Sequence, residues 1–249
     1  MINTKRREFV DKIQDVYQKL SLVYDPELDQ SLTELGFIDD VLIYNDEVEV
    51  KFRLPTYWCS PNFAFIMAED IYRYVNELNW VKDVKVQLIE HCASEEINKG
   101  VTNGKEFSEA IVNFGGSEGN LEELRMKFQI KAFYARQEKL IKYLIHHMGF
   151  SIEYIISMTI EDLQNQRLNG EGSLFRSKYV EKKNMFNHEN QLAFTTPEGL
   201  GLTKDTFNEY LLGIKRTRIS MEFNGHYCRG LLEARYNLSS SSKKVSVDQ

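Results

Sequence analysis

Three cysteines are the side chains of this 249-residue chain that are best suited to soft-metal or nucleophilic chemistry: Cys59, Cys92 and Cys228. They lie far apart in the sequence and no two of them form a CxxC pair, so neither a disulfide framework nor a zinc finger is predicted. Any chemistry at these thiols involves single cysteines or cysteines that the fold gathers. Cys59 is the strongest candidate, because it stands in "PTYWCSP" directly before a predicted helix.

The position of Cys59 between a strand and a helix has two interpretations. Ser60 is a good N-cap and Pro61 suits the first turn of a helix. The unpaired N–H groups and the positive end of the helix dipole favour an anionic, nucleophilic thiolate at such a place. The alternative is a small apolar side chain that fills the corner between strand and helix, since free cysteine is often buried and inert. Position alone does not decide between them.

Hydrophobic periodicity predicts the elements that must hold Cys59 in place. An amphipathic helix, two strands of a hairpin, a second helix and a third strand follow one another. The second strand alternates apolar and charged residues, and the third places its valines and a leucine on one face. Helices on one face of a small sheet fit this order, which predicts a compact α+β unit. The predicted elements cover residues 7–20, 37–44, 47–54, 61–78 and 80–91.

Polar residues near these elements could support chemistry at Cys59. Asp25 and Glu27, in "YDPEL", could be oxygen ligands or hydrogen-bonding partners of the thiol. They could equally form a cap and the first turn of a following helix, and for Asp25 the cap is the favoured role. Thr56, at the predicted strand end, could hydrogen-bond the thiolate or only cap the loop.

The other cysteines stand beside histidines. His91 and Cys92 follow the third predicted strand, where adjacent side chains of an extended chain point to opposite faces, so at most one of them is expected to face Cys59. Two soft ligands near a third would suit iron or a cluster, but such a pair can also be structural. His226 and Cys228 share a face of a strand but not of a helix; because a helix is expected there, both are left out of the predicted site.

The charge distribution argues against some partners. Between residues 23 and 98 there are sixteen acidic and five basic side chains, a field that repels phosphate backbones, so no nucleic-acid partner is expected. No apolar run approaches the roughly 18 residues that cross a bilayer, and no secretory signal is recognised at the start, so the prediction is a cytoplasmic protein without a membrane partner.

The second half of the chain predicts helices and carries no recognisable catalytic motif. A long helix is expected from residue 121 to Gly149, an irregular polar stretch over 165–200, and a helix from about Thr203 that Asn224-Gly225 interrupts. The predicted fold is therefore α+β: a small N-terminal α-β-β-α-β domain followed by a mainly α-helical C-terminal domain. The predicted divisions are a domain at 1–98, a Gly-rich linker at 99–120, a helical domain at 121–237 and a disordered tail at 238–249.

The stretch from Val23 to Leu88 resembles the PaaD/SufT-like iron–sulfur cluster assembly family. The resemblance rests on "DPEL" at 25–28, Leu35-Gly36, the hairpin that follows, Cys59 at the place of the family's characteristic cysteine, and the final strand. It covers about a third of the chain. Tyr57-Trp58 before the cysteine and Ser60 after it depart from the usual pattern of the family. These two aromatic residues could shield the thiol or dock a partner.

The resemblance implies a maturation factor rather than an enzyme. Such a protein carries an iron–sulfur cluster or iron transiently, here at Cys59, and hands it to a client metalloprotein. Some members accompany bacterial multicomponent oxygenases, which makes a diiron monooxygenase a candidate client. The alternative is a metal-free chaperone or scaffold for an oxygenase subunit. A thiol enzyme is the weakest option, because no histidine is placed by sequence as a base for Cys59. The oligomeric state is open, with a homodimer as one option.

Overall fold

A computed structural model describes residues 2–111, 121–186 and 191–238. The chain divides into two compact units. The N-terminal unit comprises residues 1–121 and 224–249, and the helical unit comprises residues 122–223. Helix α10 (Lys204–Tyr236) belongs to both, because its residues up to 223 lie in the helical unit and those from 224 lie in the N-terminal unit.

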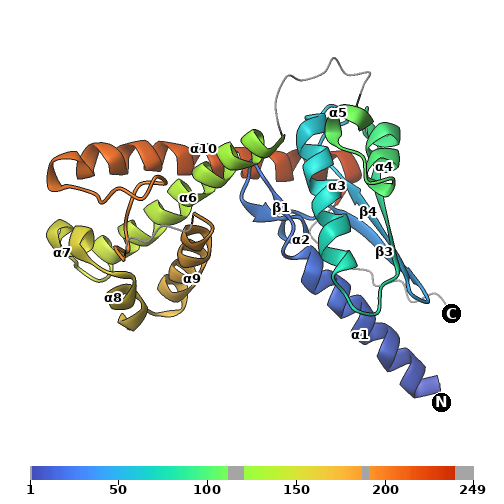
Figure 1. Cartoon of the computed structure of the whole chain (residues 1–249), viewed down its shortest axis with the longest axis horizontal. Coiled ribbons are helices and arrows are strands. Elements are labelled where there is room, and N and C mark those ends of the chain that lie inside the picture. The colour runs from blue at the N-terminus through green and yellow to red at the C-terminus, as the bar shows by residue number, and fades with distance from the viewer. Residues whose placement is uncertain (1, 112–120, 187–190, 239–249) are drawn as a thin grey trace. The chain divides into compact units, whose positions relative to one another are not determined.

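A three-stranded sheet is the centre of the N-terminal unit (Figure 1). Strand β3 (Ile38–Tyr44) pairs antiparallel with β4 (Glu47–Arg53), which pairs parallel with β5 (Asp83–Ile89). Asn45 adopts a positive φ of 60° in the tight turn between β3 and β4, as an Asn-Asp hairpin turn requires. The alternating apolar residues of the last two strands are buried side by side, so the predicted strands are confirmed. These residues are Val48, Val50 and Phe52 of β4 with Val84, Val86 and Leu88 of β5.

Helix α3 (Pro61–Asn76) packs against the buried face of this sheet, and helix α1 (Ile2–Leu20) packs beside α3. Helix α3 connects β4 to β5 and lies along the sheet (Figure 1), with most of its apolar side chains buried. Helix α1 contributes Val16 and Leu20, which are fully buried. Phe9, which the sequence pattern places on the same stripe, is exposed. The apolar stripe of α1 therefore extends beyond its packed part.

The segment predicted as a Gly-rich linker begins with ordered helices. Helix α4 (Ser94–Thr102) packs on β5 and α3, and helix α5 (Phe107–Ala110) packs on α4. Gly100 allows this contact, because a Cβ atom on it would lie 2.4 Å from the Cβ of Ala110. Residues 99–111 thus belong to the N-terminal unit, and residues 112–120 lie outside the described residues.

The segment that carries "DPEL" forms a small turn rather than the start of a helix. Strands β1 (Tyr24–Asp25) and β2 (Gln30–Ser31) pair antiparallel around residues 26–29. The helix α2 (Leu32–Leu35) begins after them, with a capping box between Ser31 and Glu34, and Gly36 ends it at a φ of 73°. Asp25 therefore does not cap that helix; its role in the turn is described below.

The helical unit has its own core, built by the long helix α6 and the shorter helices that pack around it. Helix α9 lies within the stretch that the sequence predicts as irregular, so that prediction is wrong. No helix in the described part of the chain is both long and apolar enough to cross a membrane. The helices are α6 (Leu121–His146), α7 (Ile152–Ser157), α8 (Ile160–Asn165), α9 (Gly170–Asn184) and the first part of α10.

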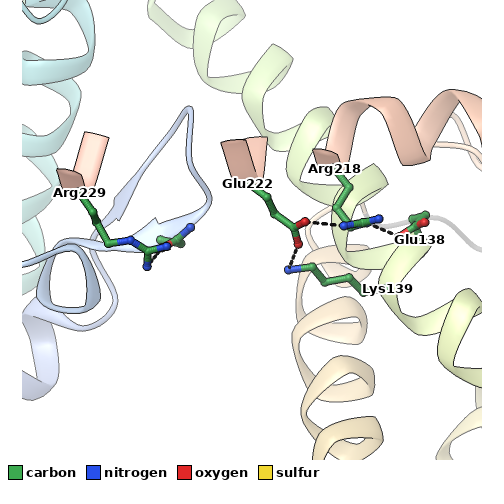
Figure 2. A network of polar contacts seen from close by, with 6 residues as sticks. Glu138, Lys139, Arg218, Glu222 and Arg229 are labelled. Atoms are coloured by element: carbon green, nitrogen blue, oxygen red, sulfur yellow. Dashed lines mark hydrogen bonds and ion pairs between the residues drawn. The ribbon is translucent and has the colours of Figure 1, made fainter. Parts of the chain in front are cut away.

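Polar networks join the elements of the helical unit. The fully buried amide of Gln137 donates to Tyr179 Oη and to the Thr195 carbonyl, each at 2.9 Å, and accepts from Tyr210 Oη at 2.6 Å. Helices α6 and α10 are also linked by ion pairs (Figure 2). The residues of this second network are Glu138 and Lys139 on α6 with Arg218 and Glu222 on α10.

Helix α10 continues without a break through Asn224-Gly225, so the predicted interruption there is wrong. Its last part, residues 224–236, packs on the N-terminal unit, where Leu232 joins the core. The helical domain predicted at 121–237 therefore ends earlier, at residue 223. The predicted tail at 238–249 lies outside the described residues except for Leu238.

Candidate functional site

The Cys59 thiol lies in the loop that joins strand β4 to helix α3. Its Sγ atom is 3.3 Å from Thr56 Oγ1, and its backbone N–H donates to the Thr56 carbonyl at 3.5 Å. Helix α3 begins at Pro61, although the Ser60 side chain makes no capping hydrogen bond. The thiol is free and half-buried against the core of the N-terminal unit. It is therefore held in place while part of its surface stays open.

The buried imidazole of His91 fixes the backbone of this loop. Its Nδ1 atom accepts from the Ala93 N–H at 3.2 Å, so Nε2 carries the proton and donates to the Cys59 carbonyl at 2.7 Å. Burial lowers the pKa of His91, and the neutral form is the one that makes both bonds. Ligation of a metal by His91 would require one of these bonds to break, so the geometry favours a positioning role.

Cys92 lies on the neighbouring loop, close to Cys59. Its N–H donates to the Tyr57 carbonyl at 3.0 Å, which ties the two loops together. Burial raises the pKa of Cys92, and the proximity of Cys59 adds to this effect. The sequence pattern allows only one of His91 and Cys92 to face Cys59, whereas both reach its loop. The reason is that the chain is not extended there, because Glu90 adopts a positive φ of 52°.

Asp25 organises the turn that follows strand β1. Its Oδ1 atom accepts from the N–H groups of Glu27 and Leu28 at 2.9 and 3.0 Å, which is the capping geometry of an Asx turn. The side chain is almost completely buried, and burial raises the pKa of Asp25 to about 6. An ionised carboxylate at this depth is costly unless a cation or hydrogen bonds compensate for it.

Replacing Asp25 by asparagine is expected to change how the stability depends on pH. The pKa of Asp25 is raised from 3.8 to about 6 in the folded chain, so the folded chain binds this proton more tightly than the unfolded chain does. The stability that this proton binding contributes is complete below about pH 4 and is lost as the pH rises through 6. A shift of this size corresponds to about 2–3 kcal/mol. Asparagine keeps the two backbone hydrogen bonds and removes the charge.

The measurement is urea unfolding of the full-length wild type and Asp25→Asn chains between pH 4 and pH 7.5. The variant should gain stability relative to the wild type by about 2–3 kcal/mol across this range. Stability profiles that stay parallel over the whole range would show that Asp25 does not titrate as its burial indicates.

Cys228 is the residue of the site that the sequence interpretation missed. It lies on the part of α10 that packs on the N-terminal unit, is half-buried, and packs against the same core as Cys59 and Cys92. Burial raises the pKa of Cys228 to about 11, and Asp25, Cys59 and Glu27 lie close enough to contribute to the shift. The spacing of Asn224, Cys228 and Leu232 at intervals of four residues places them on one face of a helix, but it does not connect that face with Cys59.

Tyr57 and Trp58 form an exposed aromatic pair next to the thiol. Their ring centroids lie 4.9 Å apart in an edge-to-face arrangement, and Trp58 is 75% exposed. Aromatic residues such as these are enriched at protein–protein interfaces. The pair lies beside Cys59 in sequence and in the same loop.

The side chains gathered here offer soft and hard ligands without forming a complete metal cage. Within the ranges that the structure describes, no three His, Cys, Asp or Glu side chains are arranged to hold a metal ion. Thiolates suit iron and iron–sulfur clusters, and carboxylates add negative charge that attracts cations. The site could bind one side of an iron centre and leave its other positions to ligands from elsewhere.

Comparisons with known proteins agree with the resemblance seen in the sequence. Residues 13–88, which run from α1 to β5 and include Asp25 and Cys59, match the model of a family described as iron-sulfur cluster assembly protein. An uncharacterized protein of Methanocaldococcus jannaschii is 36% identical over 88 residues, which are 34% of this chain and 90% of that protein. The chain therefore belongs to the iron–sulfur cluster assembly protein family.

Proposed function

We propose that the chain is a cytoplasmic maturation factor that carries iron or an iron–sulfur cluster transiently at Cys59 and passes it to a client metalloprotein. The observation that carries this proposal is the placement of Cys59: a free, half-buried thiol against Thr56, on a loop whose backbone His91 fixes. Membership of the assembly family supports it. The iron or cluster is cargo, and the chain acts as an assembly factor rather than as a catalyst.

The surroundings of Cys59 suit a cargo that must leave again. Metal binding removes the proton of the thiol, and the sulfur then bonds to iron. A fixed loop reduces the conformational entropy that binding must overcome. Asp25 and Glu27 are carboxylates near the thiols and favour a cationic cargo. Because the chain supplies few ligands to the iron, other coordination positions stay free for ligands of the client. The iron can then be transferred by exchange of one set of ligands for the other.

The identity of the client is a finer part of the proposal. We propose a multicomponent monooxygenase, with a diiron hydroxylase as the candidate, because the sequence resembles assembly proteins that accompany such oxygenases. The helical unit is proposed to select this client. It has its own core and lies outside residues 13–88, so it can add specificity without altering the assembly domain.

A second candidate function is that of a metal-free chaperone that holds an oxygenase subunit. The observation that favours it is the exposed pair Tyr57 and Trp58, because aromatic side chains are enriched where proteins bind one another. In this alternative Cys59 only fills the corner between β4 and α3. The two functions differ in whether the chain binds metal at all.

Anaerobic reconstitution separates the two functions. Full-length chain is incubated with ferrous iron and sulfide, freed of excess reagent, and measured by absorbance and by counting iron per chain. Bound iron or cluster is expected for a maturation factor. Absence of bound metal together with retained binding of the client, captured from the native host, would favour the chaperone and contradict cargo carriage.

Replacing Trp58 by alanine is expected to weaken client binding by about tenfold or more, because a central exposed tryptophan often contributes about 2 kcal/mol to an interface. The matched control is Tyr44→Ala, which removes another exposed aromatic residue, at the end of β3 next to the hairpin turn. Binding is measured by titrating immobilised client with each chain. Unchanged affinity of the Trp58 variant would exclude docking through this pair.

A further inference from the structure

The last part of helix α10 presents one face to the segments that carry the family motif. Asn224, Cys228, Leu232 and Arg235 follow one another at intervals of four, four and three residues, so they share one face of the helix. Leu232 is 2% exposed, and its Cδ2 atom lies 3.7 Å from where a Cβ atom on Gly36 would stand. Cys228 lies one turn from Leu232 on this buried face.

Hydrogen bonds at both ends fix how this face lies on the N-terminal unit. At one end the Asn224 amide donates to Glu27 Oε1 at 3.5 Å, and Arg229 donates to Gln30 Oε1 at 3.2 Å (Figure 2). Gly225 permits this approach, because a Cβ atom there would lie 2.8 Å from Gln30 Nε2. This end of the segment is therefore held on the turn that contains Asp25.

At the other end Arg235 reaches the strand ends that lead into the two cysteine loops. Its guanidinium donates to the Leu54 carbonyl at 3.3 Å and to the Glu90 carbonyl at 2.8 Å. Leu54 starts the loop of Cys59, and Glu90 lies two residues before Cys92. Cys228 lies between Asn224 and Arg235 on this face and packs against the same core as Cys59. Cys59 is also close enough to Cys228 to contribute to the raised pKa of its thiol.

We propose that Cys228 is the second thiol of the Cys59 site, and that a thiophilic divalent metal ion such as ferrous iron is held there by the sulfur atoms of both cysteines. This rests on the proposed function of Cys59. The inference adds a ligand from helix α10, which lies outside the residues 13–88 that match the family model. Each thiol gives its proton to solvent as its sulfur bonds to the metal, and no electron is transferred.

Two thiolates from separate segments are well suited to transient carriage. Soft thiolate ligands favour iron over the harder cations of the cell, and a tetrahedral ion with two protein thiolates keeps two positions for small molecules or client side chains.

A metal titration tests the joint ligation. Full-length wild type, Cys59→Ser, Cys228→Ser and Cys228→Val chains are titrated anaerobically with Co²⁺, whose thiolate charge-transfer absorbance grows with the number of bound sulfurs. Both Cys228 variants are expected to bind at least about tenfold more weakly and with lower absorbance per ion. The valine variant keeps apolar packing, so it separates ligation from filling of the core, and unfolding curves confirm that each chain folds.

The outcomes distinguish this inference from the proposed function. Binding that needs Cys59 but is unchanged in both Cys228 variants would overturn the role of Cys228 and leave the proposed function intact. Binding that is absent in the wild type, or that does not need Cys59, would overturn both.

A second test uses no metal. In a Cys92→Ser chain the only remaining thiols are Cys59 and Cys228, and dibromobimane becomes strongly fluorescent when it bridges two thiols that are close together. Fluorescent, intramolecularly bridged chain is expected, and it should be lost when Cys228→Ser is added. Failure of the Cys92→Ser chain to form the bridge would show that the two sulfur atoms do not meet, and would overturn the inference.

Discussion

Replacing Cys59 by alanine is expected to lower the amount of active client metalloprotein in the native host by at least about tenfold, with the amount of folded chain unchanged. Loss of a single residue that only supports a metal ligand costs metal sites about 10–100-fold, and loss of a ligand should cost at least as much. Alanine keeps the backbone, so the bonds of the loop to His91 and Thr56 remain possible. The measurement is client activity per amount of client protein.

Two further variants show whether the thiol itself is responsible. Cys59→Ser keeps a polar atom near Thr56 but offers a hard oxygen in place of soft sulfur, so it should fail as alanine does. Thr56→Val replaces the hydroxyl group by a methyl group of similar size and should have a smaller effect. Full maturation of the client with Cys59→Ala would contradict the role of the thiol.

Replacing Gln137 by leucine is expected to lower the free energy of unfolding of the helical unit by about 2–4 kcal/mol. The buried amide of Gln137 makes three hydrogen bonds, to the buried Tyr179 and Thr195 and to the partly buried Tyr210. Leucine matches its size but leaves these buried groups short of partners, which costs about 1–3 kcal/mol for each group that stays unsatisfied. The Tyr179 hydroxyl still donates to the Ala193 carbonyl, and the Tyr210 hydroxyl still reaches the Thr195 carbonyl at 3.3 Å, which limits the loss.

The matched control is Gln164→Leu, the same substitution at an exposed position of α8. It should change stability by less than about 0.5 kcal/mol. Urea unfolding of the full-length chains, followed by a probe in the helical unit, gives both values. A Gln137 variant as stable as the Gln164 variant would show that the buried network does not hold this unit together.

The parts of the fold that the sequence predicts correctly are those set by local patterns. Alternation of apolar and charged residues over 47–54 defines β4 without reference to any other element. Pro61 marks the start of α3 because its ring suits the first helical turn. Gly149, which follows α6, has the positive φ of 69° that the predicted helix end requires.

The parts that the sequence does not predict depend on tertiary contacts. Helix α9 begins with Gly170 and Gly172, which lower helix propensity, but Gly172 is needed because a Cβ atom there would lie 2.4 Å from the ring of Tyr143. The sequence predicts an interruption at Asn224-Gly225 because these residues also have low helix propensity. There, packing against Gln30 and Glu27 overrides the local preference and keeps α10 helical.

In the candidate site, too, contacts set by local spacing can be predicted from the sequence and contacts set by tertiary packing cannot. Thr56 and Cys59 are three residues apart in one loop, so local spacing is enough to suggest their contact. Cys228 is brought to the site by a helix that returns from the second half of the chain, and no local pattern could reveal this. The hydrogen bond from His91 to the Cys59 carbonyl likewise depends on how two loops meet.

Transfer of cargo between purified proteins tests the central claim most directly. Chain loaded anaerobically with iron and sulfide is freed of excess reagent and mixed with an apo-acceptor whose holo form has a distinct absorbance or circular dichroism spectrum. The wild type is expected to convert the acceptor to its holo form faster than the same amount of free iron and sulfide, and a Cys59→Ser chain treated identically is expected to give no more than that background. Equal transfer by the Cys59→Ser chain, or a wild type that converts no acceptor, would contradict the claim that the chain delivers iron from Cys59.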